Sequence, residues 1–217
     1  MPQLHHHLAA CAVHGIGHVC PARQLFRCIQ ARHIGVQAFD DASIAPYAEK
    51  LMGNFLFERK SGEAGTGIGT GYVSPGHNSA YYDETTDQYF LIFHTRFPQQ
   101  GEQHQVRVHQ MFINKNGWPV VAPHRYAPTT DKTVTAEQLA GSYKLIEHGK
   151  DISAQIKNSV SVNLLANGSI SGDKTGSWVY GTNQQISINL DSSGSYEGVV
   201  SRQWHESKLS GAIELLG

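Results

Sequence analysis

Alternating apolar and polar residues predict four β-strands between residues 77 and 122. The runs HNSAYYD (77–83) and QYFLIFHTR (88–96) flank ETTD, which has the length of a hairpin connection. In QVRVHQMFIN (105–114), one face carries Val106, Val108, Gln110 and Phe112, and the other carries Arg107, His109, Met111 and Ile113. WPVVAP (118–123) follows a turn, and its proline restricts it to an edge strand. Four consecutive antiparallel strands are typical of one β-propeller blade, which needs neighbours to cover its apolar faces.

A second alternating region follows a polar connector at residues 125–139. Short strand-like segments are separated by Asn-Gly and Ser-Gly turns, and SVSVNLLANGSISG (159–172) predicts a hairpin with Ala166, Asn167 and Gly168 at its tip. This spacing predicts a compact antiparallel sandwich or barrel. Its expected core is Tyr143, Leu145, Val160, Val162, Leu164, Trp178, Ile186, Ile188, Val199 and Trp204.

The first 39 residues differ in composition from the rest of the chain. They contain all three cysteines and no acidic residue, whereas the body from Asp40 onward has no cysteine. One interpretation is a metal site built from His14, His18, Cys20 and Cys28, although this spacing fits no standard zinc pattern. A second is a short tag around HHH (5–7). A third, which we favour, is that this stretch is not native coding sequence, for instance an out-of-frame start to a truncated gene.

Charge and hydropathy exclude several kinds of partner. The net charge of −1 argues against a surface that follows nucleic-acid phosphates. No run of about 18 apolar residues is present, so we expect no membrane span. The apolar patch near the start has no preceding lysine or arginine, so residues 1–20 do not match a signal peptide.

The acidic residues of the body do not form an evident catalytic pair. Acid–base hydrolysis commonly uses two positioned carboxyl groups, one that gives a proton and one that takes it. Asp40 and Asp41 adjoin the unusual first segment, and four further candidates lie in loops or beside basic residues: Glu58, Glu63, Asp83 and Glu84. We expect these groups to be solvated surface charges. Tyr81, Tyr82 and Trp118 could stack on a sugar ring, but packing between blades is the expected role.

Four strings resemble the endo-arabinanases of glycoside hydrolase family 43. They are KLMGNFLFERK, GTGYVSPGHNSAYYDE, VRVHQMFINKNGWPVVAPHRY and KLIEHGKDIS, and the resemblance covers about residues 39–217. In that family, a five-bladed propeller cleaves α-1,5-linked arabinan, and the longer members add a β-rich C-terminal domain.

The resemblance implies an all-β fold: a partial five-bladed propeller, about one blade and part of another, followed by an antiparallel sandwich or barrel. Residues 39–126 would be the C-terminal part of the propeller and residues 127–217 the C-terminal domain. Residues 1–38 match nothing in the family, and we expect them to be disordered or aberrant.

The resemblance also assigns roles to histidines. Gly76-His77-Asn78 matches a motif whose histidine contacts a calcium ion near the propeller axis, so His77 is the expected metal ligand. Asn78 is a candidate for substrate binding, and so are His94 and His109, which lie in predicted blade strands and could face the central channel. A histidine in such a strand is more often a hydrogen-bonded structural residue, and this is the role that we favour for both. The inverting mechanism of the family uses an aspartate base, a glutamate acid and a further aspartate, all expected upstream of the matched segment.

The expected function is therefore hydrolysis of arabinan by an extracellular, monomeric enzyme, of which this chain is a portion that is inactive alone. The alternative is a non-catalytic carbohydrate-binding or structural β module.

Overall fold

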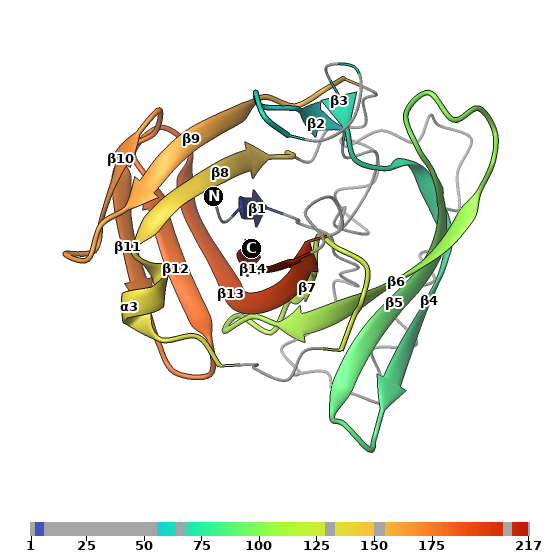
Figure 1. The fold of residues 1–217 in the computed structure, drawn as a ribbon. Coiled ribbons are helices and arrows are strands. Elements are labelled where there is room, and N and C mark those ends of the chain that lie inside the picture. Colours follow the sequence, from blue (N-terminus) through green and yellow to red (C-terminus); the bar gives the residue numbers. More distant parts are fainter. Residues whose placement is uncertain are drawn as a thin grey trace, which may run out of the picture.

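The fold is described by a computed structural model that places residues 3–6, 56–63, 67, 69–128, 133–149, 155–205 and 210–216. Nearly all regular elements are strands, as the sequence predicts. The strands form a closed barrel, a four-stranded sheet and a two-stranded sheet (Figure 1). The expected metal site at His14, His18, Cys20 and Cys28 lies outside the described residues.

The four-stranded sheet confirms the predicted blade. Its strands lie in the order β4 (Val73–Asp83), β5 (Gln88–Arg96), β6 (Gln105–Ile113) and β7 (Pro119–Val121), and all neighbours are antiparallel. β7 is the short edge strand that its proline requires. β4 begins four residues earlier than the predicted 77, because irregular pairing around Gly76 allows the strand to continue past that glycine.

The two faces of this sheet differ in burial, as the alternation in residues 105–114 predicts. The face that we call the Phe93 face carries a cluster of buried residues: Tyr72, Ala80, Leu91, Phe93, Met111 and Val121. The opposite face, which we call the His94 face, carries Tyr81, Phe90, Ile92, His94, Val106, Val108, Phe112 and Val120.

The barrel is formed mainly by consecutive antiparallel strands of the C-terminal region. They are β8 (Gly141–Glu147), β9 (Ser159–Leu164), β10 (Ser169–Gly172), β11 (Gly176–Tyr180), β12 (Gln185–Leu190), β13 (Gly194–His205) and β14 (Ser210–Leu216). Between β14 and β8 lies β1 (Gln3–His6), which is parallel to both and closes the barrel. Apart from these four residues, the first 38 lie outside the described part, so the expectation for them stays a prediction.

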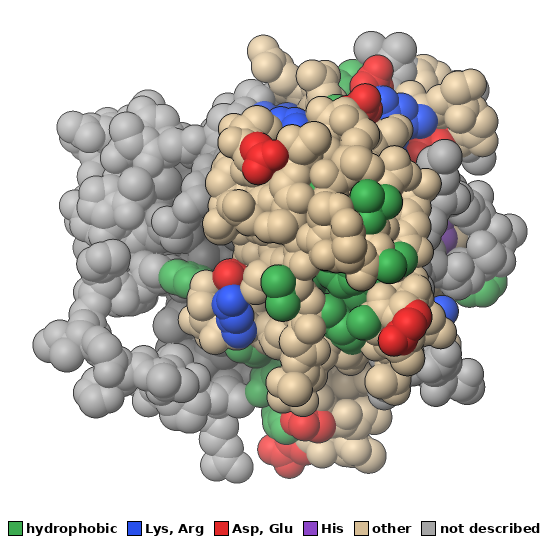
Figure 2. Space-filling model, turned by 90° about the vertical axis from the view of Figure 1, so that its left-hand side faces the viewer, with side chains coloured by type: hydrophobic (Ala, Val, Ile, Leu, Met, Phe, Trp, Pro, Cys, Tyr) green, Lys and Arg blue, Asp and Glu red, His purple; other side chains and the backbone are tan. Residues whose placement is uncertain are grey.

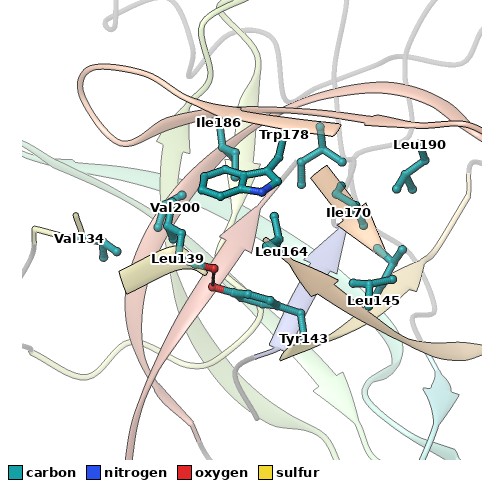
Figure 3. Packing of buried hydrophobic residues seen from close by; sticks show 12 residues of the cluster. Val134, Leu139, Tyr143, Leu145, Leu164, Ile170, Trp178, Ile186, Leu190 and Val200 are labelled. Carbon is teal, nitrogen blue, oxygen red and sulfur yellow. Dashed lines mark hydrogen bonds between the residues drawn. The ribbon is translucent and has the colours of Figure 1, made fainter. Parts of the chain in front are cut away.

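The barrel interior matches most of the predicted core. Tyr143, Leu145, Val162 and Trp178 are buried there with the other core residues, and Tyr143 donates a hydrogen bond to the carbonyl oxygen of Leu139 at 2.8 Å (Figure 3). Leu139 belongs to α3 (Ala136–Leu139), a short helix within the stretch that the sequence predicts as connector. The sequence analysis placed Val199 and Trp204 of β13 in the barrel core, and both predictions were wrong. Val199 belongs to another buried cluster, and its neighbour Val200 points into the barrel instead. Trp204 is only half-buried.

Val199 instead packs against the blade. It forms a small buried cluster with Val120 and Ala122. Nearby, the Asn114 side-chain amide donates to the carbonyl oxygen of Glu197 at 2.9 Å, and Lys115 pairs with the Glu197 carboxylate at 2.7 Å. The blade and the barrel therefore share an interface with an apolar centre and polar contacts around it.

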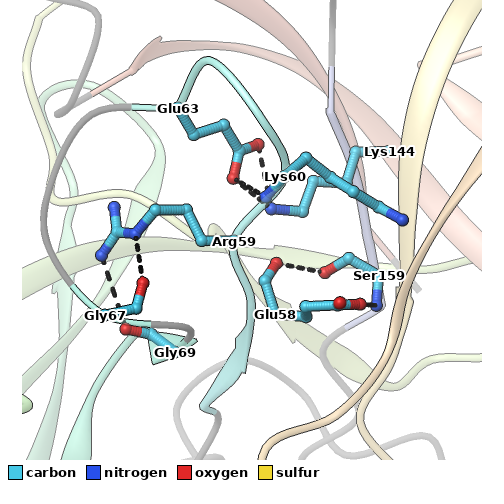
Figure 4. Close-up of polar contacts among 8 residues, drawn as sticks. All are labelled: Glu58, Arg59, Lys60, Glu63, Gly67, Gly69, Lys144 and Ser159. Carbon is cyan, nitrogen blue, oxygen red and sulfur yellow. Dashed lines mark hydrogen bonds and ion pairs between the residues drawn. The ribbon is translucent and has the colours of Figure 1, made fainter.

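A second connection joins the barrel to the segment before the blade. β2 (Phe57–Glu58) and β3 (Gly69–Thr70) form a small antiparallel hairpin. The backbone of Glu58 accepts a hydrogen bond from the Ser159 hydroxyl at 2.7 Å, and Glu63 accepts two from Lys144 (Figure 4). These contacts attach the hairpin to strands β8 and β9.

Candidate functional site

His77 lies in the irregular part of β4, where the pairing register with β5 shifts twice. Its φ of 45° is in the left-handed region, which is uncommon for a residue with a side chain. A Cβ atom at Gly76 would lie 3.4 Å from Nε2 of His94, so the glycine gives the His94 ring room to lie over β4. The Gly76-His77-Asn78 motif thus presents His77 and Asn78 as exposed side chains at a bulge.

Three histidine rings lie in series at this end of the blade. The His77 Nδ1 and His94 Nε2 atoms are 3.4 Å apart, and the two ring centroids are 4.6 Å apart. The His94 ring is also 4.6 Å from the His104 ring. Partial burial lowers the pKa of His94, and the neighbouring His104 and His77 lower it further. The structure therefore brings together two predicted site residues, His77 and His94, with a neutral imidazole favoured at His94.

His104 was missed by sequence reasoning. It lies just before β6, and its approach to His94 depends on the path of the loop between β5 and β6. Nothing in the spacing of histidines along the chain predicts that path.

His109, a predicted substrate contact, lies elsewhere and is only 1% exposed. Its Nδ1 is 2.6 Å from the carbonyl oxygen of Ala122, which can only accept, so Nδ1 carries the hydrogen. Nε2 then accepts from the Tyr72 hydroxyl at 3.0 Å. Both ring nitrogens of His109 are therefore hydrogen-bonded on the buried Phe93 face. In this structure the ring has no exposed nitrogen that could bind a sugar, whereas the sequence analysis expected the residue to face the central channel.

The described residues do not by themselves fit a calcium ion at His77. Calcium prefers about six to eight oxygen ligands, whereas the nearest described partner of His77 is another imidazole. Among the described residues, no group of three or more His, Cys, Asp or Glu side chains has a geometry that could hold a metal. The assignment of His77 as a metal ligand therefore stays a prediction for a propeller that contains further donors.

The carboxyl groups near the blade make local contacts. Asp83 accepts hydrogen bonds from the Thr86 hydroxyl and the Thr85 backbone, which lower its pKa. Asp87 accepts from the Tyr82 hydroxyl at 2.7 Å, and Glu63 is paired with Lys144. A general acid in glycoside hydrolysis needs a raised pKa, and a lowered one at Asp83 suits a turn residue.

Two of the three aromatic residues considered for sugar stacking are half-buried, Tyr82 and Trp118. Tyr82 stacks on Tyr89 with ring centroids 4.7 Å apart. Tyr81 differs, because it is 52% exposed on the His94 face.

No helix in the described part of the chain has the length and apolar character of a membrane span.

Comparison with known proteins identifies the C-terminal domain. Residues 123–213 match a family model described as the C-terminal lipocalin-like domain of glycoside hydrolase family 43. This range contains β8–β13 and agrees with the closed barrel.

Two curated relatives extend the match into the blade. The chain is 53% identical over 176 residues to "Extracellular endo-alpha-(1->5)-L-arabinanase 2" of Bacillus subtilis (strain 168), which covers 81% of this chain and 36% of that protein. It is 44% identical over 168 residues to the extracellular endo-α-(1→5)-L-arabinanase of Thermotoga petrophila, covering 76% of this chain and 35% of that protein. The chain thus spans about a third of the length of these relatives.

Solved structures agree with the sequence matches. A family 43 glycoside hydrolase from Bacillus licheniformis superposes with a TM-score of 0.71 at 47% identity, covering 86% of this chain and 40% of that one. The endo-1,5-α-L-arabinanase of Thermotoga petrophila gives a TM-score of 0.69 at 40% identity, with 80% and 38% covered. The chain is therefore similar to the C-terminal portion of the arabinanases of glycoside hydrolase family 43, and its residues 123–213 match the C-terminal domain of that family.

Proposed function

We propose that this chain supplies the C-terminal blade and barrel of an enzyme that hydrolyses α-1,5-arabinofuranosidic bonds in arabinan. The observation that carries the proposal is the 53% identity to an endo-arabinanase that extends through both the blade and the barrel. The similarity covers the blade and the barrel, which pack against each other. We infer that the two parts work together in this chain as they do in the relative, because residues on both sides of their interface must fit each other. Both curated relatives are named extracellular, so we propose action outside the cell.

The catalytic acids of the inverting mechanism are proposed to lie in the part of the propeller that this chain does not contain. The described carboxyl groups at the blade support this division, since Asp83, Asp87 and Glu102 are each engaged in a hydrogen bond or ion pair within the blade. The chain alone then binds or positions arabinan but does not cleave it.

His77 and His94 are proposed to face the substrate channel of the complete propeller. Both lie on the first two strands of the blade, and they contact each other at its irregular end. The calcium ion expected at His77 would then require oxygen donors from other blades, and the chain alone would not retain it. Asn78 is exposed beside His77 and is proposed as a polar contact for a sugar hydroxyl.

A chimera tests whether this chain is a working C-terminal portion. The matched part of the Bacillus subtilis arabinanase is replaced by residues 39–217 of this chain, and release of reducing ends from linear arabinan is measured. We expect an active, soluble chimera, and His77→Ala in the chimera should lower kcat. A folded chimera with no activity would contradict the proposal, and the parent enzyme serves as the control.

A further inference from the structure

The barrel contains one strand position that its consecutive strands do not fill. From β8 to β14 every neighbouring pair is antiparallel, so the strands alternate in direction, and β8 and β14 run the same way. β1 lies between these two strands and is parallel to both (Figure 1). The residues that match the C-terminal domain of the family, 123–213, do not include β1. The strand that completes the barrel therefore comes from outside that domain.

A hairpin next to β8 or β14 could not supply this strand. A hairpin turn reverses the chain, whereas parallel neighbours need a crossover connection of about a dozen residues or more. The strand must therefore come from a segment that is distant in sequence from both neighbours. β1 meets this requirement, because Gln3 pairs with Lys144 on one side and with Glu214 on the other.

On the β8 side, the pairing takes place in the interior of the molecule. Leu145 belongs to the barrel core, and both Leu145 and Ile146 are 0% exposed, so β8 is covered on both of its faces. An edge strand that faces water is normally protected by charged side chains, prolines or bulges. β8 contains no proline, and its Lys144 is paired with Glu63 instead of facing water. Buried backbone groups need partners, so β8 is built to be paired along this edge.

The other described strands of the barrel have no such position. β9–β13 are each paired along both edges by their neighbours in sequence. Figure 2 shows the side formed by β9–β12, where charged side chains of both signs are scattered over the surface. Only the position between β8 and β14, within the described part of the barrel, depends on a segment from elsewhere in the chain.

We propose that the position between β8 and β14 is a strand-binding slot. It recognises the backbone of an extended segment from outside the domain by strand addition on both sides, and residues 3–6 of this chain occupy it. The inference goes beyond the proposed function, because it concerns how the barrel is closed and does not depend on hydrolysis. It also gives a role to part of the first 38 residues, which the sequence analysis expects to be disordered or aberrant.

Backbone recognition explains how a segment unlike the family can fill the slot. The registers join β1 to β8 from Gln3 to His6 and to β14 from Gln3 to His5. The N–H and C=O groups that form such ladders are the same in every residue except proline. The segment QLHH therefore needs no resemblance to the arabinanases, and it contains no proline.

Amide hydrogen exchange of the full chain, followed by mass spectrometry, tests the slot. Leu4→Pro removes a backbone donor inside β1 and adds a ring that a strand paired on both sides does not tolerate. We expect exchange in β8 and β14 to become faster by about tenfold or more, with a smaller change in β11 and β12. Adding a peptide of residues 1–8 should restore the protection, and the same peptide with Leu4→Pro should not.

Two variants of the full chain serve as matched controls. Ala9→Pro introduces the same residue beyond the end of β1, and Leu4→Ala keeps the backbone donor while it shortens the side chain. In both variants, β8 and β14 should exchange as they do in the parent. Thermal unfolding verifies that each variant is folded. If Leu4→Pro unfolds the whole chain, Ala9→Pro must stay folded for the proposal to hold.

Equal exchange in Leu4→Pro and in the parent would overturn the proposal. So would equal acceleration by Leu4→Pro and Ala9→Pro, because the effect would not then depend on β1. Acceleration by Leu4→Ala would show that the side chain is recognised and would contradict backbone recognition. Sedimentation velocity of the parent should show a monomer, and a dimer that Leu4→Pro dissociates would contradict the assignment of the slot to the chain's own segment.

Discussion

The ammonium group of Lys144 lies 2.7 Å and 2.9 Å from the two carboxylate oxygens of Glu63, a residue 81 positions earlier in the chain. This pair joins barrel strand β8 to the turn after β2 (Figure 4). The Lys144 side chain is 6% exposed and that of Glu63 is 21% exposed, so the positive charge is the more deeply buried partner. Burial lowers the pKa of Lys144, and Glu63 opposes that shift.

Substituting Lys144 or Glu63 singly should therefore lower the free energy of unfolding by unequal amounts. Glu63→Gln leaves a buried ammonium group without its counter-charge and should lower the free energy of unfolding by about 3 kcal/mol. Lys144→Met leaves a carboxylate that water can reach and should cost about 1 kcal/mol or less. Urea unfolding of both variants measures the difference, and a larger effect for Lys144→Met would contradict this view of the pair.

The hydrogen bond from Tyr72 to His109 should stabilise the blade. Tyr72→Phe leaves the buried Nε2 of His109 without that donor and should cost about 1–3 kcal/mol in the free energy of unfolding. Tyr81→Phe removes a hydroxyl from an exposed tyrosine and is the matched control, with an expected change within about 0.5 kcal/mol. Equal effects of the two substitutions, measured by denaturant unfolding, would contradict a stabilising role for the hydrogen bond between Tyr72 and His109.

Alanine substitutions at two glycines with positive φ distinguish the stability cost of backbone strain from that of steric crowding. Gly172 has a φ of 113°, and a Cβ there would lie 2.6 Å from the carbonyl oxygen of Ser161. Gly194 has a φ of 95° and no atom within 4 Å of that position. Alanine should be costly at both, and Gly172→Ala should cost about 1–3 kcal/mol more because β9 and β10 must move apart. Similar melting temperatures for the two variants would argue against close strand packing at Gly172.

Tyr196 should reduce stability at high pH. Burial and then its hydrogen bond to Glu147 raise the pKa of Tyr196 to about 12. A tyrosine in the unfolded chain has a pKa of about 10, so between pH 10 and about 12 the unfolded state loses a proton that the folded state keeps. The free energy of unfolding should therefore fall as pH rises through this window.

Tyr196→Phe should remove part of that decline. An ultraviolet titration of phenolate absorbance provides the direct measurement, in which the variant should lose one late-titrating tyrosine. The same late fraction in variant and parent would contradict the assignment. Tyr82, whose pKa is also raised to about 12 by its hydrogen bond to Asp87, should remain in both.

Much of the fold could be predicted from local pattern. The alternation in residues 105–114 correctly placed Met111 and Val106 on opposite faces, because side chains on a strand alternate between faces. The structure then shows that Met111 is on the buried face and that Val106 is exposed. Val199 shows where the pattern fails. In β13 both Val199 and Val200 are buried, one against the blade and one inside the barrel, so alternation alone could not say which belonged to which core.

The candidate site was less predictable than the strands, because its contacts depend on loop paths and on which face of the sheet each side chain occupies. Gly76-His77-Asn78 could be recognised as a motif, but the contact of His94 with His104 depends on the loop before β6. His109 has the same strand context as His94 in the sequence, yet it lies on the opposite face and inside the blade. A role can therefore be assigned to a strand histidine only when the face of the sheet on which its side chain lies is known, in addition to the strand that contains it.

Our central proposal is that this chain carries the blade and barrel of an arabinanase and that the groups which cleave the substrate lie outside it. The most direct measurement is the release of reducing ends from debranched arabinan by the purified chain alone, followed over several hours with the Bacillus subtilis arabinanase as a positive control. The account predicts no release above a protein-free blank. Sustained release by the chain, abolished by substitution of one of its own carboxylates, would contradict it.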